Sequence, residues 1–497
     1  MTCCSSSAPV AASAPPPLPL RSLLLRPGAA SLILPVSRAS RRLVPVRAAL
    51  SDPFVLEIAE KFEDSLSSAA AAASPPPLQK LRDCSSQSLL SKRWPSNKDE
   101  PFRFTNLAFL KSSLLLPASS PIALPVETPL DSPSPHLLAV VDGRVAPSVS
   151  RLDALPTGVF VGSVSAIPPG PTLDRVVSAL TGGFTDGDLF WDLNGVGAPD
   201  LAVIFVPAGV RVVDEPIHVQ LCYSEGGDVG SECLPVSNPR VLVVAEKGAE
   251  VVIVEEHLGI EENAERCYWA NSVMEISIGE GAKVVHSYLQ KQSVNAAHIK
   301  WTSTRQFVYF EASSIYELIE VSTGGRLSRH NLHIQQLGPD TVSELAAFHI
   351  SRNNQTQDLH STLILDHPRG YSRQLHKCIV SHSSGQAVFD GNIRVNRFAQ
   401  QTDAGQLTRT LLLAPHATAN VKPNLQIIAD DVKCSHGAAI SDLEEDQLFY
   451  FQARGIDPKT ARDALVFSFG AEVISRIPFE PIKKSVSSQL KHLLSTQ

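Results

Sequence analysis

Apolar runs of the β type dominate the chain between about residues 200 and 435. Branched and aromatic residues gather there in short runs separated by Gly, Ala or polar turns, and almost no helical periodicity is present. Residues 247–250 (Lys-Gly-Ala-Glu) and 280–283 (Glu-Gly-Ala-Lys) open two of the runs in a similar way, which indicates imperfect coils stacked along an axis. A β-sandwich would require more regular hairpin turns, so the pattern slightly favours a β-helix. The predicted strands are 202–206, 241–244, 250–254, 284–289, 307–310, 315–321, 387–395, 407–413 and 425–428.

The N-terminal third has a mixed pattern. Residues 52–66 carry an apolar side chain at every fourth position from Phe54 onward, which predicts an amphipathic helix. The proline-rich stretch from 117 to 171 predicts irregular chain and short edge strands rather than long helices. Within it, Asp142 and Gly143 separate two short apolar runs and are typical of a type I′ hairpin turn. We therefore expect a small mixed subdomain.

Helical signals return after the last β run. Residues 441–444 (Ser-Asp-Leu-Glu) form a capping box that predicts a helix ending at Gly455. Residues 457–458 (Asp-Pro) supply an N-cap and a proline at the first helical position, which predicts a second helix to about residue 474. A last amphipathic segment spans 482–494. The simplest interpretation of these helices is a cap on the end of the β-helix, which would not prevent them from binding another protein.

The first 51 residues have the composition of a transit peptide. They contain six arginines and no acidic residue among many Ser, Ala and Pro. Their apolar runs are interrupted by Arg26 and Pro27, so a secretory signal is not indicated. Residues 46–49 (Val-Arg-Ala-Ala) resemble a stromal processing site. We predict that 1–48 is a chloroplast transit peptide and that the mature protein resides in the stroma.

Charge and cysteine content exclude several classes of protein. The formal net charge of −7 argues against nucleic acid as a partner. Every long apolar window contains a charge or a proline, so no membrane span is expected. The cysteines beyond the transit peptide have no repeat spacing and do not indicate a disulfide framework. We expect Cys222, Cys267 and Cys378 to be small buried apolar residues, and Cys84 and Cys233 to lie in polar loops.

Cys434 and His436 are the candidate metal ligands. They lie two residues apart in a predicted strand, so their side chains point to the same face. A thiol and an imidazole form a plausible pair for a soft metal, but a structural site needs four ligands. The others would have to come from elsewhere, for example from another chain. Most remaining histidines are predicted to be hydrogen-bonded ladder residues: His257, His286, His330, His333, His349, His360 and His367.

Motifs of the common enzyme classes are absent from the sequence. No GxxxxGK[ST], GxSxG, HExxH or GxGxxG occurs, which removes the ATPase, hydrolase, zincin and dinucleotide-binding interpretations. The main alternative is a carbohydrate-active β-helix enzyme, whose tempting carboxylates would be 255–256 and 430–431. Neighbouring residues on a strand point to opposite faces, so neither pair would form a shared acid/base dyad. A protein that holds a metal cluster by itself would need three or four convergent Cys or His ligands, which a single Cys-x-His pair cannot supply.

Several segments resemble the SufB/SufD family. The run 429–437 (Ala-Asp-Asp-Val-Lys-Cys-Ser-His-Gly), with 448–450 (Leu-Phe-Tyr) and 454–456 (Arg-Gly-Ile), is similar to the C-terminal signature of that family. The resemblance is strong over about 200–477 and loose over 90–200. Further segments that carry it are 372–377, 389–393, 400–404, 411–413 and 422–425, with weaker echoes at 93–95, 101–107 and 206–210.

The resemblance implies a fold, partners and a role. It implies a right-handed parallel β-helix over 201–440, preceded by a helical and mixed region over 49–200 and followed by a C-terminal helical domain over 441–497. Unlike SufB-like chains, this sequence has no cysteine between Cys378 and Cys434, and Gly437 and Ala438 follow His436, so it resembles SufD.

A SufD-like chain would be a non-catalytic scaffold subunit for iron–sulfur cluster assembly. It would pair with a SufB-like subunit through the β-helix and bind a SufC-type ABC ATPase through its C-terminal helices. The chain alone would hold no cofactor stably. Iron or an iron–sulfur cluster would contact His436 and Cys434 transiently at the interface of the complex.

Overall fold

The structure is a computed structural model that describes residues 51–69, 75–118, 134–152, 155–181, 184, 186–224, 233–259, 267–308 and 313–495. The chain divides into two units, Met1–Ala48 and Ala49–Gln497, and every described residue lies in the second. The transit peptide predicted for residues 1–48 therefore lies outside the described residues.

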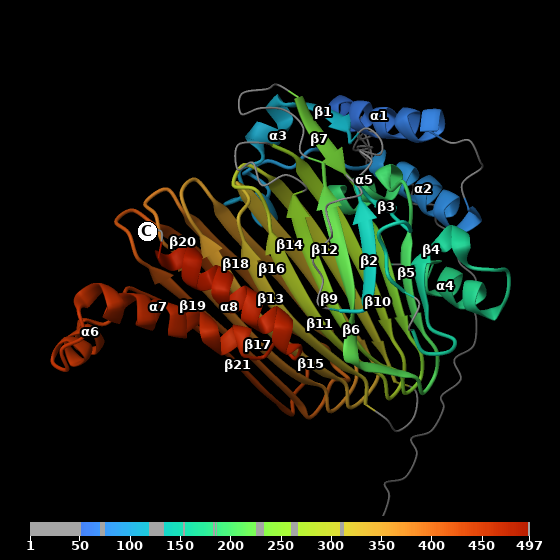
Figure 1. The fold of residues 1–497 in the computed structure, drawn as a ribbon. Helices are drawn as coiled ribbons and strands as arrows, with labels where there is room; N and C mark the ends of the chain where they lie inside the picture. The colour runs from blue at the N-terminus through green and yellow to red at the C-terminus, as the bar shows by residue number, and fades with distance from the viewer. Residues whose placement is uncertain are drawn as a thin grey trace, which may run out of the picture. The chain divides into compact units, whose positions relative to one another are not determined.

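Two sheets of mainly parallel strands face each other across a shared interior (Figure 1). One sheet has the order β20-β18-β16-β14-β12-β10-β8-β5-β4, and the other has the order β21-β19-β17-β15-β13-β11-β9-β6-β2-β3. From β8 to β21 the chain thus crosses from one sheet to the other with each strand. Lys283 pairs with Ile315, Ile315 with Val342 and Val342 with Tyr371, so one coil takes about 30 residues. The predicted parallel β-helix is confirmed as a parallel β-solenoid.

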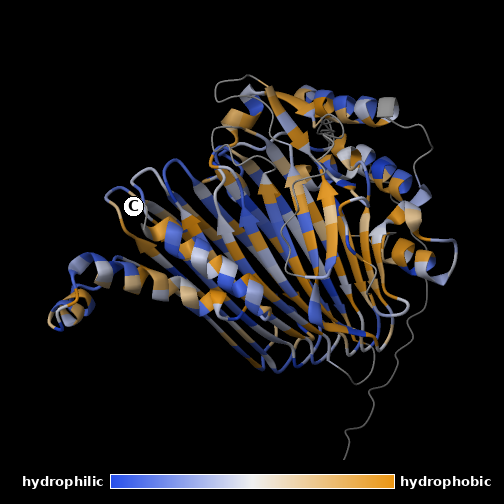
Figure 2. Ribbon diagram, in the orientation of Figure 1, coloured by the Kyte–Doolittle hydropathy of each residue, from blue (hydrophilic) through white to orange (hydrophobic). Residues whose placement is uncertain are grey.

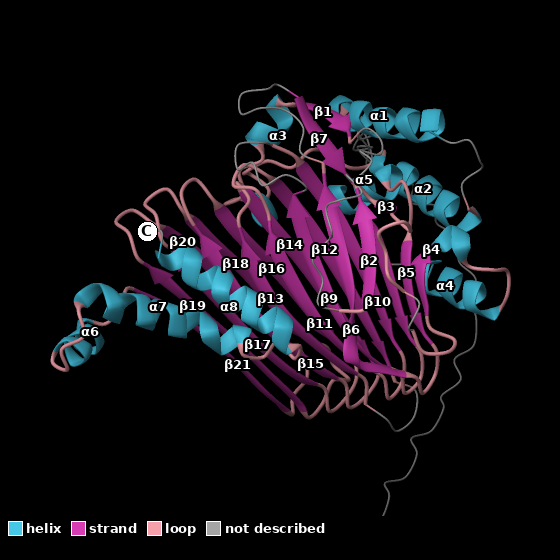
Figure 3. Cartoon of the chain, viewed as in Figure 1, coloured by secondary structure: helices cyan, strands magenta, loops and turns pink. Residues whose placement is uncertain are grey.

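Strands make up most of this unit; the N-terminal helices lie beside the first coils, and the last two helices lie across the outer face of one sheet (Figure 3). The strands are β1 (Leu114–Pro117), β2 (His136–Val141), β3 (Arg144–Val145), β4 (Phe160–Ser163), β5 (Ala202–Val206), β6 (Arg211–Tyr223), β7 (Cys233–Ser237), β8 (Arg240–Ala245), β9 (Glu250–Gly259), β10 (Trp269–Ile278), β11 (Lys283–Lys291), β12 (Ala297–Phe307), β13 (Ile315–Thr323), β14 (Leu327–Leu337), β15 (Val342–Ser351), β16 (Thr356–Leu365), β17 (Tyr371–Val380), β18 (Gln386–Val395), β19 (Thr402–Leu412), β20 (Thr418–Ile427) and β21 (Val432–Ser441). The α-helices are α1 (Pro53–Ala69), α2 (Pro76–Leu89), α3 (Ala108–Ser112), α4 (Pro171–Thr181), α5 (Leu189–Gly197), α6 (Glu445–Gln452), α7 (Pro458–Ile474) and α8 (Glu480–Ser495).

Hydropathy alternates along the strands because successive side chains point into the solenoid and away from it (Figure 2). The turns between coils are also stacked. Gly248 and Gly281 have φ values of +66° and +68°, and the strands that follow them begin in register at Glu250 and Lys283. Glycine adopts this left-handed backbone without the steric strain of a Cβ atom, which explains the repeated Gly-Ala turn in the sequence.

The N-terminal elements extend and cover the first coils. The predicted first helix is confirmed as α1, whose buried side chains Val55, Ile58 and Phe62 pack in one apolar cluster with α5. The predicted hairpin is confirmed as β2 and β3, and Asp142 and Gly143 both have positive φ. Strand β2 pairs with β6, and β4 pairs with β5. The N-terminal region therefore adds strands to both sheets.

The C-terminal helices differ in how they are held. Helices α7 and α8 pack their apolar side chains, including Val473 and Leu490, against the outer face of the sheet that contains β13 and β15. Helix α6 extends beyond the solenoid (Figure 1) and has no buried residue. The predicted N-cap of α7 is confirmed, since the Asp457 carboxylate accepts a hydrogen bond from the Thr460 backbone N–H.

Some sequence predictions were wrong. Ser441 is the last residue of β21 and not a helix cap, because α6 begins at Glu445 with Glu444 at its N-cap position. The run 307–310 is not a strand of its own: Phe307 ends β12, and 309–310 lie outside the described residues.

The cysteine predictions held in part. Cys222 and Cys378 are buried as predicted, but Cys267 is only half-buried. Cys84 lies in α2 and Cys233 begins β7, so neither lies in a loop.

Candidate functional site

Cys434 and His436 lie on β21, the strand at the free edge of its sheet. Their partners in register on β19 are Ala404 and Gln406, which are buried inside the solenoid. Paired residues on neighbouring parallel strands share a face, so both candidate ligands belong to the inward row, as the spacing predicted. Beyond them no further coil is stacked on the described part of the chain. An interior row of side chains is therefore open at this end.

The two side chains differ in exposure. Cys434 is half-buried and packs against the interior apolar cluster, whereas His436 is exposed. Burial raises the pKa of the Cys434 thiol above its ordinary value, and a hydrogen bond with the Ala404 backbone opposes this rise only in part. Cys434 is thus a protonated thiol near neutral pH. A metal ion would have to displace that proton on binding.

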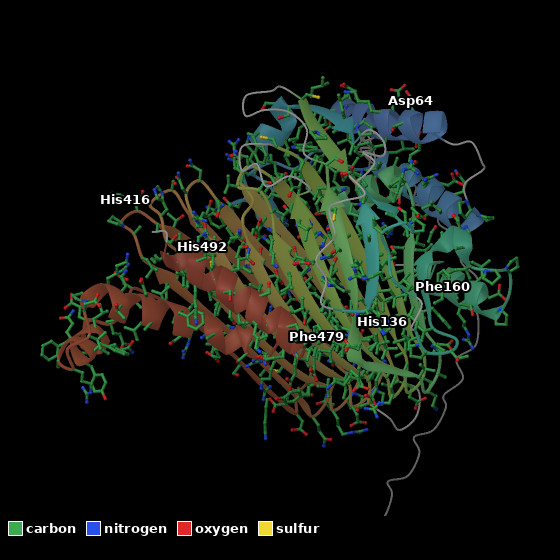
Figure 4. The ribbon with its side chains drawn as sticks, viewed as in Figure 1. Asp64, His136, Phe160, His416, Phe479 and His492 are labelled. Carbon is green, nitrogen blue, oxygen red and sulfur yellow. The ribbon has the colours of Figure 1, made fainter. Side chains whose placement is uncertain are left out.

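The rim around this pair is apolar and exposed. Ile427 and Ile428 at the end of β20 and Ile440 on β21 are 45%, 53% and 47% exposed. His416 marks the turn between β19 and β20 at the same end of the solenoid (Figure 4). Exposed isoleucines beside an unpaired strand edge are the usual composition of a protein-binding surface.

The described residues supply no third ligand at this end. No group of three or more His, Cys, Asp or Glu side chains within the described ranges is arranged to hold a metal ion. Asp430 and Asp431 lie in the turn before β21 and not on a strand, contrary to the prediction. The Asp431 backbone accepts a hydrogen bond from the Gln401 N–H at 2.6 Å, so this turn is tied to the preceding one. The described residues thus place one thiol and one imidazole at this end, fewer than the four ligands of a closed structural site.

A separate group of charged side chains is buried inside the solenoid and centres on Glu255. Its carboxylate lies 2.6 Å from Lys300 Nζ, 2.8 Å from His257 Nε2 and 3.0 Å from His286 Nε2. Burial opposes ionisation of Glu255, but Lys300 and His257 outweigh it and hold the pKa of this carboxyl well below its ordinary value. The neighbouring Glu256 faces outward and contacts other groups. As predicted, the two carboxylates do not share a site.

A second buried carboxylate, Glu320, lies between two histidines. His330 Nδ1 and His349 Nε2 are each 2.8 Å from its oxygens. Burial opposes ionisation here too, and the two imidazoles lower the pKa of Glu320 despite it. Both groups confirm the prediction that these histidines are hydrogen-bonded interior residues.

The other predicted histidines differ in their surroundings, and His333 on β14 is buried with its Nε2 atom 3.4 Å from Asp186 Oδ2. His360 lies 2.9 Å from Asp358, as expected of a bonded residue. His367 is exposed in the turn after β16 and is not part of the ladder. The sequence interpretation missed two interior members, His298 beside Ser272 and His376 beside Thr408. Their alternation with apolar neighbours on β12 and β17 is the signal that could have found them.

Comparisons with known proteins identify the family. Residues 228–469 match the family described as SUF system FeS cluster assembly, SufBD core domain. The chain is 57% identical over 457 residues to the Arabidopsis thaliana protein named Protein ABCI7, chloroplastic, with 91% of this chain and 93% of that protein covered. It is 36% identical over 411 residues to an iron-sulfur cluster assembly SufBD family protein of Synechocystis, covering 81% of this chain and 88% of that protein. The chain belongs to the SufBD family.

Within the SufBD family the chain is SufD-like. It is 28% identical over 410 residues to the iron-sulfur cluster assembly protein SufD of Escherichia coli, with 81% of this chain and 90% of that protein covered. Cys434 and His436 both fall inside the matched SufBD core. Among the helices of the described part, none is long and apolar enough to cross a membrane.

Proposed function

We propose that this SufBD-family chain is a non-catalytic, SufD-type scaffold subunit for iron–sulfur cluster assembly in the chloroplast stroma. Residues 1–48 would be its transit peptide. The chain would pair with a SufB-like subunit through the open end of the solenoid and would bind a SufC-type ATPase through its C-terminal helices. The observation that carries the proposal is the position of Cys434 and His436 on the inward row of the edge strand β21.

The exposed strand edge supports the pairing. Among the described strands, β21 has a hydrogen-bonded neighbour on one side only, namely β19, so its other edge offers backbone donors and acceptors to a second chain. The exposed side chains of Ile427 and Ile440 would be buried in the same contact. A partner that continues the stack would bring its own inward side chains opposite Cys434 and His436.

His436 would then be the exposed imidazole ligand, or proton acceptor, at a transient iron or cluster site. Replacing His436 by Ala in the co-expressed complex should lower the iron and sulfide content per assembled complex without dissociating it. His367→Ala is the matched control, because it removes another exposed histidine from a turn of the same solenoid.

Iron, acid-labile sulfide and melting temperature are measured on the same purified complexes. A structural role for His436 would instead lower the melting temperature and the yield of complex together, with normal iron per surviving complex. Unchanged iron with reduced stability would therefore contradict the proposed role. Cys434→Ser tests the neighbouring thiol in the same assay.

A further inference from the structure

An N-terminal motif that the cluster-assembly proposal does not use forms part of a surface groove. Residues 93–95 (Arg-Trp-Pro) and 101–107 were noted in the sequence as weak family echoes. In the structure Trp94, Pro95 and residues 103–107 of these segments line a hollow of about 580 Å³ together with Lys111. A second hollow of about 800 Å³ adjoins it, and Asn106 and Gln386 line both. The two hollows form one groove between α3 and the turns of the solenoid, near its upper edge in Figure 1.

The charge of this groove is opposite to that of the chain. Among the described residues, its lining includes four cations, Arg103, Lys111, Arg326 and Arg352, and no aspartate or glutamate. The chain as a whole has 43 basic and 50 acidic residues, so four cations without a carboxylate are a local departure from its composition. A groove with charge of one sign attracts and orients ligands of the other sign.

The four cations are held in position without a close ion partner. Within the described residues none of them forms an ion pair; Glu100 pairs with Lys422, and Arg103 also attracts the Glu100 carboxylate and helps to lower its pKa. Arg326 lies 4.5 Å from the centre of the Phe109 ring, and Arg103 lies 5.7 Å from that of Phe104. Contact with an aromatic face holds a guanidinium in place and leaves its N–H donors free.

Neutral polar groups occupy the space between the cations. Asn353 and Asn354 lie in the turn between β15 and β16, and Ser384 lies in the next turn of the stack. The turns are fixed against each other, because Ser384 Oγ donates to Asn353 Oδ1 at 2.8 Å and accepts from the Asn354 N–H at 2.9 Å. Asn353 and Asn354 are exposed. Such amides can bond to the backbone of an extended peptide.

We propose that this groove binds an acidic peptide segment of a partner protein. The distribution of charge favours a peptide over a phosphate compound. Phosphate sites gather backbone N–H groups and cations around one point, commonly at a glycine-rich loop or a helix N-terminus. Here the cations come from four separate places, which are the segment before α3, α3 itself and two turns of the solenoid. Carboxylates spaced along an extended chain match that arrangement.

The test measures binding of a fluorescently labelled (Gly-Glu)₄ peptide to the full chain by fluorescence anisotropy at low ionic strength. We expect saturable binding that weakens with added salt, and much weaker binding of (Gly-Gln)₄. The variant Arg326→Glu/Arg352→Glu should lose about tenfold or more in affinity, because two attractions become repulsions. Arg394→Glu/Arg397→Glu makes the same charge change at two other exposed arginines and should lose less than about twofold.

Circular dichroism and melting temperature establish that each variant is folded. If Arg326→Glu/Arg352→Glu is not folded, Arg326→Gln/Arg352→Gln takes its place. Absence of saturable (Gly-Glu)₄ binding to the unaltered chain would overturn the proposal. So would equal losses in the groove variant and the control variant, which would indicate non-specific attraction. If pyrophosphate displaces the peptide and itself binds more tightly with the same variant dependence, the groove is a phosphate site and the peptide assignment is wrong.

Discussion

The buried pair of Lys300 and Glu255 allows a sharp test of how the interior polar groups contribute to stability. Both side chains are 1% exposed, and Lys300 Nζ lies 2.6 Å from Glu255 Oε1. Lys300→Met keeps the length and apolar stem of the side chain and removes its charge. Glu255 would then lose its only lysine partner within the described residues and keep His257 and His286.

Removing one partner of a buried pair leaves an uncompensated charge and destabilises a protein by about 3–5 kcal/mol. The two histidines can take up a proton and supply part of the missing charge, so the lower end, about 3 kcal/mol, is expected. Unfolding entropy is about 2.1 cal/mol/K per residue, or roughly 0.9 kcal/mol/K for the unit Ala49–Gln497. The melting temperature should therefore fall by about 3 °C.

Lys283→Met is the matched control. Lys283 Nζ lies 2.6 Å from Glu317 Oε1, but these side chains are 38% and 31% exposed. A surface pair of this kind contributes about 1 kcal/mol or less, so its melting temperature should change by less than about 2 °C. The double variant Lys300→Met/Glu255→Gln should recover at least half of the loss. A single Lys300→Met variant that melts with the control, or a double variant less stable than the single one, would refute the reasoning.

Two further predictions concern acid stability and the last helices. Burial lowers the pKa of His257 to about 4. Between about pH 6.5 and 4 the unfolded chain therefore binds a proton at this residue that the folded chain does not. The free energy of unfolding must fall as the pH falls through this window. Melting temperatures measured from pH 8 to 5 should therefore decline, with a shallower slope in His257→Gln; a flat profile would contradict this. On α6, Phe449 and Tyr450 are 70% and 55% exposed, so Phe449→Asp/Tyr450→Asp should abolish co-purification of the SufC-type ATPase and leave the SufB-like partner bound. The control Leu90→Asp changes another exposed apolar residue and should affect neither partner. Loss of the SufB-like partner with the ATPase still bound would mean that the two surfaces are wrongly assigned.

The sequence predicted the parts of the fold that depend on local pattern. Period-two runs, the Gly-Ala turns and the Asp457 N-cap all have short-range physical causes, and the structure confirms each of them. The capping box at Ser441 failed because pairing overrode it: Ser441 lies opposite Leu411 in the ladder between β19 and β21. A backbone ladder that continues to Ser441 leaves that residue no freedom to begin a helix.

The site could be predicted only as far as its two residues. Their spacing placed Cys434 and His436 on one face, and the register with Ala404 and Gln406 now makes that face the interior row. How far each of the two side chains is buried depends on where the stack of coils ends, and no local sequence pattern encodes that position. The buried group of charged side chains around Glu255 was also missed, because its partner Lys300 comes from the opposite sheet, 45 residues away in sequence, and no local pattern encodes that contact.

A solenoid makes a site at its end from the same row of side chains that makes its core. On each inner coil the inward row is covered by the next coil, so Ala404 and Gln406 are buried. On β21 the same row has no covering strand among the described residues, and Cys434 and His436 are left half-buried and exposed. Side chains in that position are rigidly held by the ladder below them and yet accessible from above. A second chain that continues the stack would enclose them between two cores, where water is scarce and a soft metal or cluster can be shielded. The proposed role of Cys434 and His436 therefore depends on the ending of the stack as much as on the two residues themselves.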